Sequence, residues 1–133
     1  MAAARKTRRR VVAIVDDDVS VREAMAAYLE SHGLAIRCFP SAEQFLRSRL
    51  CRSAGCLILD LRLEGMSGLE LQRRLQVQGV SAPVIYCTGE ADDDGRLQRR
   101  LLQAGARAVL SKPYPPEELL QLVQAALNLR SDS

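Results

Sequence analysis

The sequence holds few of the residues that bind soft metal ions. It has one histidine, His32, and four cysteines, and no two cysteines form a C-x-x-C pair. Structural zinc sites normally bring four such ligands together at short spacings, so this pattern argues against a zinc site. Cys38, Cys56 and Cys87 lie in or beside apolar runs, where a reduced thiol behaves as a small hydrophobic group. This usage indicates a reducing environment, and we expect the protein to be cytoplasmic.

Long apolar runs are also missing. No stretch approaches the roughly 20 apolar residues that span a bilayer, and no apolar segment of a secretory signal follows the basic N-terminus. The 133 residues contain no internal repeat, low-complexity segment or domain linker. The length therefore predicts a single domain. We place it at residues 10–128, with a leader at residues 1–9 and a polar tail at residues 129–133.

Acidic residues are absent from the first ten positions, which hold five of the 19 lysines and arginines. The other 14 basic residues face all 16 acidic ones, so the net charge of +3 becomes −2 outside this segment. Basic segments of this kind bind nucleic acid or a membrane surface in some proteins. We interpret this one as a solvated, partly disordered leader and expect no membrane contact.

Five short apolar runs alternate with five amphipathic segments. Three of the runs are nearly continuous in Val, Ile, Leu, Ala and Cys, as in strands buried on both faces of a parallel sheet. Strict alternation of strand and helix predicts an α/β fold with a doubly wound parallel sheet. The predicted strands are Arg10–Val15, Leu34–Phe39, Cys56–Leu59, Pro83–Cys87 and Arg107–Leu110.

The segments between the runs carry the signals of helix ends. Three serines are each followed, three residues later, by Glu or Gln, which is the pattern of a capping box. Gly33 is predicted to end the first helix in a left-handed conformation, and the last helix is predicted to begin at Pro116. The three capping serines are Ser20, Ser41 and Ser67.

Reactive side chains follow four of the five predicted strands. Ligands of open parallel sheets bind beyond the carboxyl ends of the strands, so these side chains should meet at one edge. Crowded carboxylates repel one another unless a cation lies between them, and Mg²⁺ is a hard cation that suits carboxylate oxygens. A nearby hydroxyl and ammonium suit phosphoryl oxygens, and a carboxylate beside them suits attack on phosphorus. The residues are Asp16, Asp17 and Asp18, then Asp60, then Thr88, and finally Ser111, Lys112 and Pro113.

Each of these features alone has a simpler structural explanation. An acidic run or a single Asp after a strand is often a turn or a helix cap, and Thr-Gly and Lys-Pro pairs are common in loops. Their recurrence, in order, at the ends of four strands favours the functional interpretation.

Four segments that together span about residues 10–128 resemble the receiver domain of response regulators, in the CheY-like superfamily. They are IVDDDVSVRE, LILDLRLEGMSGLEL, PVIYCTGE and GARAVLSKPYPPEEL. The segments SAEQFL and DLRLEGMSGLEL are similar to those of FixJ-type receivers that precede a LuxR-type helix-turn-helix. The resemblance implies a flavodoxin-like fold, a parallel sheet in the order 2-1-3-4-5 flanked by five helices.

The resemblance also implies a phosphoryl and metal site. Asp60 corresponds to the phosphoacceptor. Mg²⁺ is expected to bind Asp17 directly, Asp16 partly through water, Asp60, and the backbone carbonyl of Arg62. The side chains of Arg62 and Glu90 are expected to tune the lifetime of the phosphoryl group, or else to be simply solvent-exposed.

Residues of the last two strands receive roles from the same resemblance. Thr88 corresponds to the switch hydroxyl and Lys112 to the invariant-type lysine, and a cis peptide bond is expected between Lys112 and Pro113. The family usually has an aromatic residue three positions before the lysine, where this chain has Val109. Coupling of Thr88 to an aromatic ring is therefore absent or rerouted here.

The implied function is a signalling phosphoacceptor that catalyses only its own phosphorylation and dephosphorylation. A histidine kinase transfers its phosphoryl group to Asp60, and the change spreads to the surface of the fourth helix, fifth strand and fifth helix. That surface is also a candidate homodimer interface. We expect the output to be transcription, through a DNA-binding domain outside this chain, although a single-domain receiver also fits the sequence.

Three alternatives remain open from the sequence. A pseudo-receiver would bind partners without phosphorylation, and Val109 keeps that interpretation in play. A phosphatase of the haloacid-dehalogenase class normally carries its nucleophile as D-x-D after the first strand, whereas Asp60 follows the third. A flavodoxin-like cofactor binder needs a hydroxyl-rich phosphate loop after the first strand, and Asp16, Asp17 and Asp18 stand there instead.

Overall fold

A five-stranded parallel sheet forms the centre of the computed structural model, which describes residues 11–89 and 94–131. The predicted leader at residues 1–9 and the candidate Glu90 lie outside the described residues. The strand order is β2-β1-β3-β4-β5, as predicted, and every neighbouring pair is parallel. The strands are β1 (Val11–Val15), β2 (Ala35–Phe39), β3 (Cys56–Leu59), β4 (Val84–Thr88) and β5 (Ala108–Ser111).

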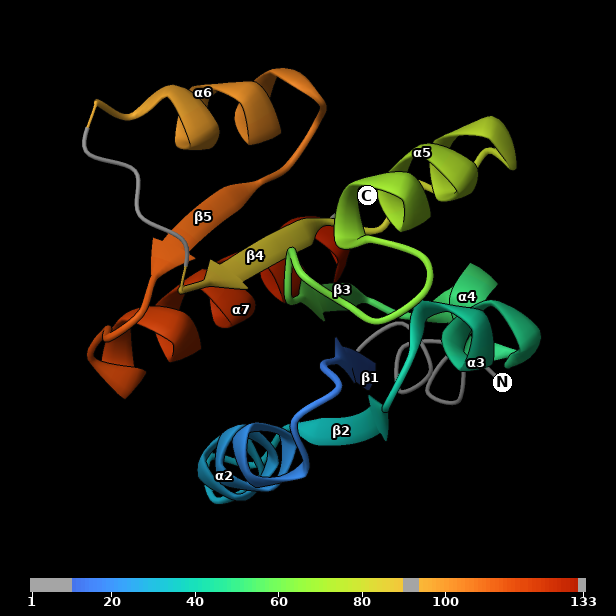
Figure 1. Cartoon of the computed structure of the whole chain (residues 1–133). Coiled ribbons are helices and arrows are strands. Elements are labelled where there is room, and N and C mark those ends of the chain that lie inside the picture. The colour runs from blue at the N-terminus through green and yellow to red at the C-terminus, as the bar shows by residue number, and fades with distance from the viewer. Residues whose placement is uncertain (1–10, 90–93, 132–133) are drawn as a thin grey trace.

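Helices cover both faces of the sheet (Figure 1). In the described part of the chain, four helices pack on one face and two on the other. The first face carries α3 (Ala42–Arg47), α4 (Leu50–Ser53), α5 (Gly68–Val77) and α6 (Arg96–Gln103), and the second carries α2 (Val19–Glu30) and α7 (Pro116–Ser131). None of the described helices is long and apolar enough to cross a membrane.

The strands β1, β3 and β4 are buried along almost their whole length, which explains their apolar sequences. Successive side chains alternate between the two core layers: Ala13 and Val15 pack under α3–α6, while Val12 and Ile14 pack under α2 and α7. Because all five strands are parallel, their carboxyl ends lie at the same edge of the sheet.

Helix α2 begins two residues before the point that the capping box at Ser20 predicts. Its N-cap is Asp18, whose Oδ1 accepts hydrogen bonds from the backbone N–H groups of Ser20 (2.9 Å) and Val21 (3.3 Å). The prediction of Ser20 as the cap was wrong because the carboxylate just after β1 already satisfies the free N–H groups of the first turn.

The segment predicted as one helix after β2 is divided into α3 and α4, so the described chain has six helices where the sequence predicts five. The division lies at Ser48, whose backbone is extended and whose hydroxyl donates to the carbonyl of Phe45 (2.7 Å). A serine that bonds its own local backbone competes with helix continuation.

Other predicted helix ends are confirmed. Ser41 and Ser67 are N-caps that accept hydrogen bonds from the N–H groups of Gln44 and Glu70, and Gly33 has a positive φ of 84°. Helix α7 begins at Pro116 but continues to Ser131, into the segment predicted as a polar tail.

The cysteine interpretation needs one correction. Cys56 and Cys87 are buried in the core, as predicted, whereas Cys38 is exposed. Cys38 lies on β2, which is an edge strand with three exposed positions out of five. Its apolar neighbours in the sequence are therefore no guide to its burial.

Candidate functional site

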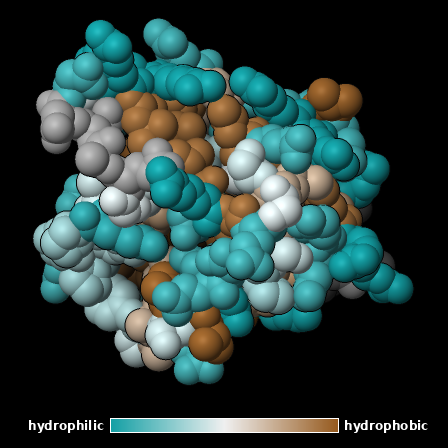
Figure 2. Space-filling view, viewed as in Figure 1, coloured by the Kyte–Doolittle hydropathy of each residue, from teal (hydrophilic) through white to brown (hydrophobic). Residues whose placement is uncertain are grey.

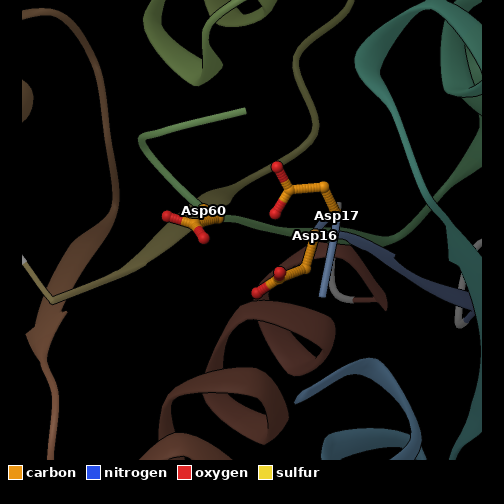
Figure 3. A group of neighbouring side chains, drawn as sticks. All are labelled: Asp16, Asp17 and Asp60. Atoms are coloured by element: carbon orange, nitrogen blue, oxygen red, sulfur yellow. The ribbon is translucent and has the colours of Figure 1, made fainter. Parts of the chain in front are cut away.

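Three carboxylates converge at the carboxyl edge of the sheet, in front of β1 and β3 (Figure 3). Asp16 and Asp17 directly follow β1, and Asp60 directly follows β3. One oxygen from each residue can be chosen so that all three lie within 4.8 Å of one another. The structure thus brings together three of the four acidic residues that the sequence placed at this edge.

The backbone around these carboxylates is held by hydrogen bonds that extend the sheet beyond the strand ends. The N–H of Asp16 donates to the carbonyl of Phe39 (3.2 Å), and the N–H of Asp60 donates to the carbonyl of Val15 (3.1 Å). Arg22, on the first turns of α2, donates from Nη1 to the carbonyl of Asp16 (2.6 Å). This last bond ties the loop of the acidic pair to the helix that follows it.

Asp16 is the buried member of the group, with 1% of its surface exposed. Its Oδ1 accepts from the N–H of Asp18 (2.9 Å), but its buried Oδ2 has no hydrogen-bond partner among the described residues. Burial raises the pKa of Asp16, and the nearby Asp60 and Asp17 raise that pKa further, against the backbone bond and Lys112, which lower it. A buried carboxylate oxygen that accepts no hydrogen bond, beside two other carboxylates, fits the oxygen ligand set of a hard divalent cation.

Asp60 is more accessible, with 17% of its side chain exposed. Its Oδ1 accepts from the N–H of Arg62 (3.2 Å), and its Oδ2 lies 4.0 Å from Nζ of Lys112. Burial is also the largest cause of the raised pKa of Asp60, which Asp17 raises further and which the Arg62 bond and Lys112 oppose. The Asp60 carboxylate is thus partly desolvated and still within reach of a partner molecule.

The ends of β4 and β5 place a lysine and a hydroxyl on this edge. The N–H of Lys112 donates to the carbonyl of Thr88 (2.8 Å), and its Nζ lies 3.8 Å from Oδ2 of Asp16. Thr88 is buried and pairs in register with Ser111 on β5. The Lys112–Pro113 peptide bond is cis. Lys112 is therefore positioned between two carboxylates by the strand end that precedes it.

Not every residue singled out at the strand ends joins this group. Asp18 caps α2. Ser111, which precedes Lys112 in the sequence, is exposed at the end of the edge strand β5. Val109 is partly buried on β5, where it lies beside Tyr86 in the register of β4 and β5. Arg62 is exposed at the loop after β3.

Sequence reasoning missed Arg22 and Tyr86. Arg22 lies six residues after Asp16, which is the spacing that lets the first turns of a helix reach back to the strand end. Tyr86 is fully buried and its hydroxyl donates to Gln72 (2.6 Å). A tyrosine inside an apolar strand is a signal that a buried polar partner is needed.

An apolar cavity of about 320 Å³ opens beside Lys112. It lies between α2 and the start of α7, and Met25, Tyr28, Tyr114 and Leu119 contribute to its lining. The carboxylate group is therefore flanked by an apolar hollow on the side of α2.

Comparison with known proteins agrees with this geometry. Residues 12–124 match the family model described as the response regulator receiver domain. The chain is 41% identical, over 92% of its length, to the response regulator protein TodT of Pseudomonas putida, and 38% identical, over 87%, to the transcriptional regulatory protein FixJ of Azorhizobium caulinodans. It spans only about half the length of these curated relatives, 53% and 54%.

The fold comparison points to the same family. The solved structure of the response regulator StyR superposes with a TM-score of 0.82 at 37% identity, over 92% of this chain and 61% of that one. A family match over most of the chain, relatives above 30% identity and the strand order together leave one conclusion. The chain belongs to the response regulator receiver domains of two-component signalling systems.

Proposed function

We propose that this receiver domain accepts a phosphoryl group on Asp60 from the phosphohistidine of a histidine kinase. The observation that carries the proposal is the convergence of three carboxylates within 4.8 Å, with Nζ of Lys112 at 3.8 and 4.0 Å from two of them. A carboxylate oxygen of Asp60 attacks phosphorus, the P–N bond to the imidazole breaks, and an acyl phosphate forms. Water later attacks the same phosphorus and releases inorganic phosphate, which restores Asp60.

Asp16, Asp17, Asp60 and the backbone carbonyl of Arg62 are the groups that would hold Mg²⁺. The bound ion would neutralise negative charge on the phosphoryl oxygens. The buried Oδ2 of Asp16, which accepts no hydrogen bond among the described residues, and the repulsion within the group support this assignment.

Lys112 and Thr88 are the groups of this chain that would contact the transferred phosphoryl group. Lys112 would bring a positive charge, and its backbone N–H is hydrogen-bonded to the carbonyl of Thr88. The Thr88 hydroxyl would donate to a phosphoryl oxygen. Movement of Thr88 toward that oxygen would favour a second arrangement of the α6–β5–α7 surface. The exposed Arg62, with Glu90, would tune how long the acyl phosphate lasts.

The apolar cavity beside Lys112 supports docking of the kinase at the α2–α7 side of the site. Its lining is made of side chains that a helix of the kinase would cover, and its rim reaches the lysine that lies 4.0 Å from Asp60. A phosphohistidine presented there would approach the carboxylate without crossing the sheet.

In this interpretation the protein acts in the cytoplasm.

The output would be transcription, through a DNA-binding segment outside this chain, because curated relatives of about twice its length include transcriptional regulatory proteins.

A homodimer of the phosphorylated form would use the α6–β5–α7 surface. Figure 2 shows hydrophobic side chains gathered beside α6 on a mainly hydrophilic face, and Leu102 of α6 is 40% exposed. Beryllofluoride with Mg²⁺ should then shift the molar mass in light scattering from monomer to dimer.

The phosphorylation proposal is tested with acetyl phosphate and Mg²⁺, followed by intact-mass spectrometry. The wild-type chain should gain the mass of one phosphoryl group, and chelation of Mg²⁺ should abolish the gain. Asp60→Ala should gain nothing, whereas Glu64→Ala, which removes an exposed acid from the same loop, should behave as wild type. A gain that survives Asp60→Ala would overturn the proposal, and the absence of any gain would favour the pseudo-receiver.

A further inference from the structure

A buried polar side chain lies on β4, two residues before Thr88. Tyr86 of β4 is 0% exposed, and its hydroxyl donates to Oε1 of Gln72 on α5 at 2.6 Å. Gln72 is itself 2% exposed. Burial of a hydroxyl is costly unless it is hydrogen-bonded, so this pair holds β4 and α5 in one relative position.

The other end of Gln72 reaches a third element. Its Nε2 donates to the carbonyl of Ala104 (3.2 Å), which also accepts from Nε2 of Gln76 (2.8 Å). Ala104 is the C-cap of α6, where helix carbonyls have no partner within the helix. A Cβ at Gly105, which has a φ of 108°, would lie 2.6 Å from Nε2 of Gln76 and 3.4 Å from that of Gln72. The two amides thus fit against α6 because residue 105 is glycine.

The ring of Tyr86 and the backbone of Asp60 both lie close to Gly68. A Cβ at Gly68, the first residue of α5, would lie 2.6 Å from the carbonyl oxygen of Asp60 and 3.2 Å from Cε1 of Tyr86. Thr88 follows two residues along β4 and faces the same side of the sheet. Tyr86 therefore shares β4 with the proposed switch hydroxyl, lies beside the glycine that adjoins Asp60, and is bonded to the glutamine that reaches α6.

We infer that Tyr86 and Gln72 are positioning residues that couple phosphorylation of Asp60 to the C-terminal end of α6. The inference rests on the proposed function and deepens it. Displacement of the Asp60 loop or of Thr88 moves the Tyr86 ring, the Tyr86–Gln72 bond passes the movement to α5, and the amide of Gln72 passes it to Ala104. A link of this kind transmits a signal only if its strength differs between the two states, so its removal must reduce the difference between them.

The test compares hydrogen exchange at the end of α6 with and without beryllofluoride and Mg²⁺, which stand in for the phosphoryl group. The amides of Ala104 and Ala106, which donate to Arg100 and Leu101, report on that end. In the wild-type chain we expect their exchange rates to change by about fivefold or more between the two states. In Tyr86→Phe, which keeps the ring and removes the hydroxyl, the change should fall to less than about half of the wild-type change on a logarithmic scale.

A purely structural role for the hydroxyl would speed exchange equally in both states and leave their ratio unaltered, which would overturn the inference. Gln72→Met, of similar shape, is the second variant and should also lose the coupling, so the test does not depend on the folding of one variant. Gln44→Met, which makes the same change at an exposed position on α3, is the matched control and should respond as wild type. A wild-type chain that takes up beryllofluoride without any response at residues 104–106 would likewise overturn the inference.

The two failures can be told apart by acetyl phosphate. If the wild-type chain gains no phosphoryl group, the proposed function fails. If the wild-type chain gains it and Tyr86→Phe does not, Tyr86 is needed for the site itself and the coupling inference fails alone.

Discussion

Asp16 and Asp60 carry charge in a place where water cannot fully solvate it. Burial is the largest cause of the raised pKa of both carboxyls, and neighbouring carboxylates add to it. Lys112 offsets this only in part, because its Nζ lies 3.8–4.0 Å from both carboxylates and its side chain is 32% exposed. Without a bound cation, these carboxylates therefore lower the stability of the folded chain. Such a cost is common at functional sites that gather charged side chains.

The first prediction concerns this cost. Asp16→Asn should raise the unfolding midpoint at pH 7 by a few degrees in chelator, roughly 4 °C for each kcal/mol. The folded carboxyl has the raised pKa, so between the unfolded value near 3.8 and the folded one the native state binds more protons. Stability of the wild type therefore falls as the pH rises through that window and stays low above it.

The rise in the unfolding midpoint caused by Asp16→Asn should accordingly be largest at neutral pH and should fade below about pH 3.8. Thermal unfolding followed by circular dichroism at several pH values provides the measurement. Glu64→Gln, at an exposed position, is the control and should show little gain. A variant that is less stable than wild type at pH 7 would contradict this view of the site.

The second prediction concerns Gly68, which lies against the backbone of Asp60. Gly68→Ala places a Cβ 2.6 Å from the carbonyl oxygen of Asp60, so the backbone must shift. Overpacking of this kind costs about 1–3 kcal/mol, and acetyl phosphate should phosphorylate the variant more slowly. Urea unfolding measures the cost. Gly89→Ala, where a Cβ meets nothing within 4 Å, should cost much less.

At the scale of elements, the start of α2 joins a structural role to the acidic run. The third prediction is that Asp18→Ala destabilises the chain by about 1 kcal/mol in urea unfolding, because it removes the acceptor for two N–H groups. Asp18→Asn keeps that acceptor and should lose much less. Ser20→Ala should leave the free energy of unfolding nearly unchanged, since Ser20 lies inside the helix. A large loss of stability in that variant would instead indicate that Ser20 is the cap.

Local sequence patterns predicted the strands to within one residue at each end, because apolar runs buried on both faces have few alternatives. They failed where two polar residues compete for the same role. Asp18 and Ser20 are both good caps, and only the position of the strand end decides between them. Ser48 ends α3 through a bond to its own backbone, although the helical pattern continues past it.

The candidate site was predictable because parallel strands end at one edge, so Asp16, Asp60 and Lys112 could be grouped from the topology alone. Contacts made through the core were not. Gln72 and Tyr86 are 14 residues apart, and Gln72 and Ala104 are 32 apart. No local pattern predicts which buried polar groups will pair over such separations.

For the molecule as a whole, burial separates the four cysteines. Cys38 is exposed, while burial holds the pKa of Cys56 at about 12 and that of Cys87 at about 11. The fourth prediction is that a thiol reagent labels one cysteine per native chain quickly and all four after denaturation. Cys38→Ser should remove the fast reaction, and a second fast thiol in the native chain would contradict the described core.

The claim on which the account depends is that Asp60, and neither Asp16 nor Asp17, forms the acyl phosphate. The most direct measurement treats the chain with acetyl phosphate and Mg²⁺, reduces it with borohydride, which converts a phosphorylated aspartate to homoserine, and sequences the peptides by mass spectrometry. The account predicts homoserine at position 60 alone. Homoserine at position 16 or 17, with Asp60 intact, would contradict it.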